Sequence, residues 1–165
     1  MAKGKKQGIG PVIFRLLFVL YCALMLWLLF GQRLDSVSYA DYAAQLAHNY
    51  NLIPFRTIAQ LIELWTSGRM VSFSIINVIG NIVTFVPLGG LLPCVFSPLR
   101  RFGKHTLCVA GIIVAVELVQ FVTLLGVGDI DDLILNVIGG MIGWALFRLV
   151  EAHRKTINKV DSKDK

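Results

Sequence analysis

Six polar side chains lie within stretches of the sequence that are apolar enough to cross a lipid bilayer. Two of them can ionise and four are amides: Asn77, Asn81, Glu117, Gln120, Asp132 and Asn136. Ionisable groups are costly to place inside a membrane, and those that occur there usually mark a binding site or a transport path. A carboxylate held among amides could bind a ligand through hydrogen bonds or act as a general acid or base.

The spacing of these residues indicates that they converge. Each predicted helix contributes a pair that is three or four positions apart and therefore shares one helical face; the pairs are Asn77 with Asn81, Glu117 with Gln120, and Asp132 with Asn136. Counting about 1.5 Å of rise per residue from the outer helix ends gives depths of roughly 3 to 15 Å. All six then lie in the outer half of the membrane, and we predict that they line one outward-facing pocket.

Less specific interpretations of the same residues also exist. The amides could serve only to join helices, and Glu117 could be a buried, protonated group that Gln120 or Asn81 satisfies. Asp129 and Asp131 lie nearer the water, and we expect them to be solvated loop charges. The run GDIDD lacks the spacing of an EF-hand loop and has no histidine nearby, so no metal site is predicted.

The composition indicates an integral membrane protein. The 165 residues are 56% hydrophobic and 16% charged, with a mean hydropathy of +0.70, which is far too apolar for an ordinary soluble domain. Four segments reach the roughly 20 residues that a membrane-spanning helix needs; they are Pro11–Gly31, Val71–Phe96, Thr106–Leu125 and Ile130–Val150. The first is expected to be retained, because no small-residue cleavage site follows it. The sequence thus predicts an all-α membrane protein, a bundle of four transmembrane helices.

The distribution of positive charge predicts the orientation. Of the sixteen lysine and arginine residues, all but Arg33, Arg56 and Arg69 fall on one side of a four-span topology. The positive-inside rule then places both termini in the cytoplasm. The chain divides into a basic cytoplasmic tail at residues 1–10, a membrane domain at 11–150 and a second basic cytoplasmic tail at 151–165. Anionic lipid is a sufficient partner for the net charge of +6, and nucleic acid is not expected.

The connection between the first two spans, residues 32–70, should be extracytoplasmic and carry an amphipathic helix. Ile58, Leu61, Ile62 and Trp65 form an apolar stripe at helical spacing. Such a helix could lie flat at the membrane interface or cap the bundle over a site.

Small residues and prolines suggest how the spans pack. Pro87, with Gly89 and Gly90, should weaken or kink the second span towards its cytoplasmic end. The fourth span contains Gly139-x-x-x-Gly143, a spacing that lets membrane helices approach closely.

The order and spacing of these residues resemble the bacterial VanZ-like membrane proteins. The shared pattern runs through Asn51-Leu-Ile-Pro-Phe55, Asn77-x-x-x-Asn81-x-x-x-Phe85-x-Pro87-x-Gly89, Glu117-x-x-Gln120 and Asp129-x-x-Asp132-x-x-x-Asn136-x-x-Gly139. The resemblance covers residues 11–150 and implies a location in the bacterial cytoplasmic membrane. It also implies a connection with the cell envelope and with resistance to teicoplanin, a lipid-bearing glycopeptide, to which the founding protein of the family is linked. It implies no settled biochemical activity.

The chain departs from this family pattern at one position. Many members have Gly-Arg a few residues before the acidic run, whereas here the matching stretch is LLGVGDIDD, without arginine. If that cation pairs with a pocket carboxylate in other members, Arg56 or Arg69 of the outer loop would have to replace it here.

Three functions are compatible with these features. We favour a non-enzymatic protein whose pocket binds a lipid or a lipid-linked envelope precursor. The alternatives are a membrane enzyme that uses Glu117 or Asp132 as acid or base on a lipid-linked substrate, and a small proton-coupled transporter. The sequence has no serine nucleophile elbow or glycine-rich phosphate loop for the enzyme, and the inner half of its spans lacks polar side chains for the transporter. No cofactor is expected, and homo-oligomers remain open.

Overall fold

The protein is a helical bundle with a small layer at one end. The computed structural model describes residues 9–31, 34, 41–68 and 71–161. Its long helices are α1 (Ile9–Leu29), α4 (Val71–Val95), α5 (Phe102–Thr123) and α6 (Ile130–Asp161). Shorter elements are α2 (Tyr42–His48), α3 (Arg56–Thr66), the 3-10 helix η2 (Ser97–Arg100) and the strands β1 (Tyr50–Asn51) and β2 (Gly128–Asp129).

The four predicted membrane spans are confirmed as helices of sufficient length. Within the described residues, the apolar helical segments are Gly10–Leu29, Ile76–Val95, Phe102–Thr123 and Ile130–Ile157. The third begins earlier than predicted, and the fourth continues beyond Val150. Large apolar side chains along these helices are exposed, as expected of surfaces that face lipid.

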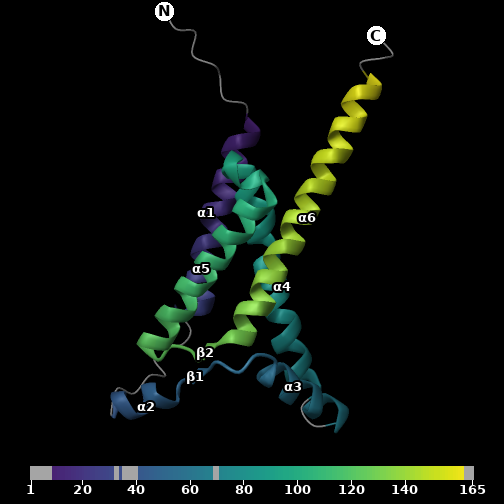
Figure 1. Cartoon of the computed structure of the whole chain (residues 1–165). Helices are drawn as coiled ribbons and strands as arrows, with labels where there is room; N and C mark the ends of the chain where they lie inside the picture. The colour runs from purple at the N-terminus through teal and green to yellow at the C-terminus, as the bar shows by residue number, and fades with distance from the viewer. Residues whose placement is uncertain (1–8, 32–33, 35–40, 69–70, 162–165) are drawn as a thin grey trace, which may run out of the picture.

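The elements separate into two ends. Figure 1 shows α2, β1, α3 and β2 together at one end of the bundle, which we term the loop end. At the opposite end α1 begins and α6 finishes, and this is the terminal end. The predicted amphipathic helix is present as α3, with Leu61 buried against the bundle and Trp65 53% exposed. Its main packing partner is α4.

Glycine allows α4 and α6 to form the most extensive contact of the bundle. A Cβ atom at Gly139 would collide with the carbonyl oxygen of Ile82, and one at Gly143 would collide with that of Val86. Because later residues of α6 meet later residues of α4, the two helices run in the same direction. The close approach predicted from Gly139-x-x-x-Gly143 is therefore confirmed.

The apolar core lies beside this contact. Its buried side chains come from α1, α4 and α5 and are Met25, Phe85, Leu88, Leu92, Val109 and Ile113. The α1 helix is also tied to α4 by a hydrogen bond from the Tyr21 hydroxyl to the carbonyl oxygen of Thr84, at 2.9 Å. The core thus joins α1, α4 and α5, and the other faces of these helices are exposed.

A buried histidine compensates for a proline in α4. The helix continues through Pro87 and Pro93, and Pro93 has no N–H to donate to the carbonyl of Gly89, four residues earlier. Nε2 of His105, on α5, lies 3.0 Å from that carbonyl oxygen, and its side chain is fully buried. His105 lies just before the predicted third span, Thr106–Leu125, and its side chain satisfies a carbonyl that the proline leaves open.

Candidate binding site

The start of α6 is organised by Asp129. Its carboxylate accepts hydrogen bonds from Nδ2 of Asn51 at 3.1 Å and from the hydroxyl of Thr57 at 2.6 Å. It also accepts one at 2.8 Å from the backbone N–H of Asp131, two residues further on, which is the bond of a helix N-cap. Asp129 therefore begins α6 and at the same time fixes the segment that contains Asn51 and Thr57.

Asp131 caps a different helix. It is fully buried, and its carboxylate accepts hydrogen bonds from the backbone N–H groups of Phe55 and Ile58. Those groups lie at the first turn of α3, where backbone donors lack partners within the helix and a negative charge is favourable. Phe55 precedes α3 with a φ of 65° and makes no side-chain cap of its own. Asp131 thus supplies the cap from another part of the chain.

The prediction that Asp129 and Asp131 are solvated loop charges is wrong. Their exposed fractions are 9% and 0%, respectively. The physical reason is that each carboxylate exchanges water for donors of residues 51–58. Each oxygen of the Asp131 carboxylate accepts one backbone N–H group. Within the described ranges, no group of three histidine, cysteine, aspartate or glutamate side chains is arranged to hold a metal ion.

Two short strands bring the loop between α1 and α4 to this position. β1 and β2 pair in parallel, with Tyr50 opposite Gly128 and Asn51 opposite Asp129. Nδ2 of Asn49 also donates to the carbonyl oxygen of Gly126 at 2.6 Å. The loop is thereby joined to the connection between α5 and α6, and α3 lies over the loop end of the bundle.

A polar cavity of about 290 Å³ lies between α3 and the three helices α4, α5 and α6. All six polar residues singled out from the sequence line it, together with Thr57 and Asp129 and the apolar Leu29, Val116 and Val127. The structure therefore brings together the faces that helical spacing predicted to converge. That this cavity binds a ligand remains a prediction.

Hydrogen bonds orient several of these lining groups. Nδ2 of Asn81 donates to the carboxylate of Asp132, which joins α4 to α6. Oε2 of Glu117 accepts from the backbone N–H of Asp129 at 3.2 Å, which joins α5 to the start of α6. Nε2 of Gln120 donates to the carbonyl oxygen of Leu29, at the end of α1, at 3.3 Å. The cavity wall is thus held by contacts from four helices.

Two amide oxygens at the cavity have no hydrogen-bond partner among the residues that the structure describes. They are Oδ1 of Asn77 and Oδ1 of Asn136, and the Asn136 side chain is only 4% exposed. A buried acceptor without a donor costs free energy, so such groups are normally satisfied in proteins. Their presence at the cavity indicates that it is suited to a molecule that donates hydrogen bonds.

Comparison with known proteins decides the family. The model of the VanZ/LLP1 family matches residues 18–151, which is most of the chain and contains every described residue of the cavity. The chain belongs to the VanZ/LLP1 family. It is also similar to Protein VanZ of Enterococcus faecium, with 27% identity over 154 residues, covering 92% of this chain and 84% of that protein. No solved structure matches.

The two arginines proposed to pair with the carboxylates of this VanZ-like cavity are placed differently. Arg56 begins α3 with an exposed side chain and is not among the residues that line the cavity. Arg69 lies outside the described residues. Which cation pairs with the cavity carboxylates in this member of the family therefore stays a prediction.

A second cavity, which the sequence did not indicate, adjoins the first in this VanZ-like fold. It has a volume of about 380 Å³ and lies between β1, α5 and the start of α6. Its walls are largely apolar and include Leu52, Val114, Leu118, Phe121 and Leu133. Glu117 and Asp129 line both cavities, so these two acids separate an apolar space from a polar one.

Proposed function

We propose that this protein binds an amphiphile at its loop end, with the polar headgroup in the polar cavity and an acyl or prenyl chain in the apolar one. The observation that supports this is the pair of adjoining cavities of opposite character, which share Glu117 and Asp129. A molecule with both a polar and an apolar part would complement both spaces. A lipid or a lipid-linked envelope component has this form.

The polar cavity favours a headgroup that donates hydrogen bonds. The side-chain oxygens of Asn77 and Asn136, which have no donor within the described part of the chain, need donors. The carboxylates of Glu117, Asp129 and Asp132 on the same wall are acceptors when ionised. Hydroxyl and ammonium groups supply donors, whereas a phosphate diester brings only acceptors. The ligand class is therefore a lipid that carries a sugar or an amine.

Binding at this position would connect the protein with glycopeptide susceptibility. The family resemblance links VanZ-like proteins to resistance against teicoplanin-type antibiotics, and the similarity to Protein VanZ extends over 92% of this chain. A protein that holds an envelope lipid at the outer surface would alter how a lipid-bearing glycopeptide reaches that surface. We infer that the effect follows from binding rather than from turnover.

Removing the carboxylates that line the cavity tests this function. Glu117→Ala and Asp132→Ala should each lower ligand retention and the teicoplanin phenotype by roughly tenfold or more, because each leaves a buried donor without its acceptor. The measurements are teicoplanin susceptibility of cells that express each variant, and mass spectrometry of the lipids that co-purify with it. Glu63→Ala, an exposed acid on α3, is the matched control.

Glu117→Gln separates binding from the two alternatives. Its amide oxygen can still accept from the N–H of Asp129, so a binding protein should keep most of its phenotype. A variant as inactive as Glu117→Ala would instead indicate that the carboxylate carries charge or a proton, as an enzyme or a transporter requires. Unchanged lipid retention and phenotype in Glu117→Ala, Asp132→Ala and their double variant, at normal expression, would refute the proposed site.

The orientation belongs to the same proposal, with the loop end outside and both termini in the cytoplasm. The cations at the terminal end support it through the positive-inside rule. In a background with Cys22, Cys94 and Cys108 replaced by serine, Ser67→Cys should react with a membrane-impermeant thiol reagent in intact cells. Lys159→Cys should react only after the cells are broken, and its labelling in intact cells would reverse the assignment.

A further inference from the structure

A third cavity lies at the terminal end, far along the bundle from the proposed amphiphile site. It has a volume of about 450 Å³ and is bounded by the start of α1, the end of α4 and the last part of α6. Pro11, Phe14, Phe147 and Val150 form its apolar walls. Pro11 and Phe14 lie at the start of the apolar segment Gly10–Leu29, and the charged residues of the cavity on α6 follow Val150, so we place the cavity at the depth where a membrane passes from hydrocarbon to headgroups.

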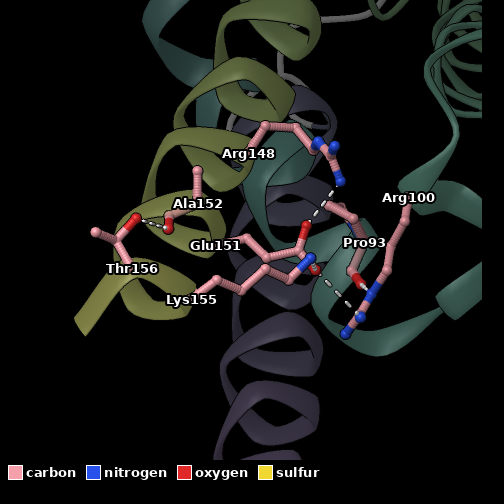
Figure 2. A network of polar contacts seen from close by, with 7 residues as sticks. All are labelled: Pro93, Arg100, Arg148, Glu151, Ala152, Lys155 and Thr156. Atoms are coloured by element: carbon pink, nitrogen blue, oxygen red, sulfur yellow. Dashed lines mark hydrogen bonds and ion pairs between the residues drawn. The ribbon is translucent and has the colours of Figure 1, made fainter. Parts of the chain in front are cut away.

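The polar rim of this cavity is mainly basic. Arg100, Arg154 and Lys155 line it together with one acid, Glu151, which gives a formal charge of three positive minus one negative, or +2. In Figure 2, Glu151 occupies the centre of the network, with cations around it. Its carboxylate contacts Arg148 at 2.7 Å, Lys155 at 3.4 Å and Arg100 at 3.5 Å.

One carboxylate cannot satisfy this number of cations. The contact between Arg100 and Glu151 is at the limit of a hydrogen bond, so the guanidinium of Arg100 can still bind another anion. Arg154 makes no ion pair with any residue that the structure describes. Arginine matches phosphate oxygens with two parallel N–H groups, and such charge-assisted bonds are the stronger kind.

Two further contacts fix the position of the Arg100 side chain. Its Nε donates to the carbonyl oxygen of Pro93 at 3.3 Å, and its guanidinium lies 5.8 Å from the centre of the Phe147 ring. The residue belongs to η2, whereas Glu151 and Arg154 belong to α6. Cations from two separate elements therefore converge on one space with apolar walls.

We propose that the terminal-end cavity binds the phosphate of an anionic phospholipid, whose acyl chains lie against its apolar walls. The excess of cations selects the anion, and the position at the ends of the spans selects a lipid over a soluble phosphate. This site is independent of the loop-end site, which favours hydrogen-bond donors instead. Under the proposed orientation, the lipid belongs to the inner leaflet.

Lipid retention by the purified full-length protein tests the proposal. Native mass spectrometry of protein supplied with phosphatidylglycerol or phosphatidylcholine should show selective retention of phosphatidylglycerol. Arg154→Gln combined with Lys155→Gln should lower its affinity on the order of twenty-fold, since each cation near a membrane surface contributes a factor of about five. Arg101→Gln with Lys104→Gln removes the same charge from exposed residues outside the cavity and should change the affinity by less than about twofold.

Glu151→Gln is the sharper variant, because it removes the competing carboxylate. We expect it to raise phosphatidylglycerol affinity about fivefold, whereas a network that serves only to stabilise α6 would show unchanged retention and a lower melting temperature. Equal retention of the two lipids, or equal losses in the two double variants, would overturn the assignment. Displacement of the lipid by millimolar inorganic phosphate would overturn it too, because the occupant would then be free phosphate.

Discussion

Gly143→Ala should prevent α4 and α6 from reaching their native separation and should destabilise the bundle by about 3 kcal/mol or more. The added Cβ atom would collide with the carbonyl oxygen of Val86 and lie 2.8 Å from the backbone nitrogen of Gly90. Both are backbone atoms of α4, which cannot turn aside as a side chain can. Association of membrane helices depends on such packing, because lipid offers no hydrophobic driving force between them.

Gly111→Ala is the matched control for this change. It adds the same methyl group to a glycine of α5 that has nothing within 4 Å of the new atom. Because alanine favours a helix over glycine, this control should be neutral or more stable by up to about 1 kcal/mol. Unfolding in mixed micelles with a denaturing detergent measures both variants. Equal stability of the two would show that the contact between α4 and α6 tolerates a wider spacing.

Asp131→Ala should release α3 from the loop end, at a cost of roughly 2–6 kcal/mol for two lost acceptors. The backbone N–H groups of Phe55 and Ile58 would lose the carboxylate that caps the helix. Since Phe55 is largely exposed, water can hydrogen-bond to its backbone N–H in the variant. We therefore expect a loss of stability in the lower half of this range. Hydrogen exchange should accelerate in residues 50–66, while α4 and α6 keep their protection.

Two comparisons make the Asp131 result specific. Asp131→Asn keeps an oxygen that can accept one of the two bonds but removes the charge, so its exchange rates should be intermediate. Glu63→Ala, at an exposed position of α3, should leave exchange unchanged. If residues 50–66 exchange at the wild-type rate in Asp131→Ala, the burial of this carboxylate has no part in holding the loop.

Helical spacing explains which parts of the site could be predicted from sequence. Residues four positions apart, such as Asn77 and Asn81, lie on the same face of any helix. The glycines of α6 at this spacing allow a neighbouring helix to approach closely. These features depend on local geometry and a common depth in the membrane. For that reason the six polar residues of the cavity were identifiable before their surroundings were known.

The other parts depend on contacts that no local pattern reveals. Asp129 and Asp131 are buried because donors from residues 51–58, more than seventy positions away, replace water around them. β1 and β2 have only two residues each, too few for a recognisable strand signal. Val114 and Leu118 line a cavity, but their sequence pattern is that of lipid-facing residues. The contact between Arg100 and Glu151 joins elements that are far apart in the sequence.

The pairing of β1 with β2 has a consequence for biogenesis. Asn51 can bond to Asp129 only after 78 further residues have been made, and Asn81 can bond to Asp132 only after 51 further residues. Asn51 and α4 would therefore leave the ribosome before the acids that bond to their polar groups have been made. The acids that match them, Asp129 and Asp132, belong to β2 and to the start of α6. The loop-end site therefore forms only after β2 and the start of α6 have been made, and a chain that stops before β2 would contain most of the cavity wall without the acids that bond to Asn51 and Asn81.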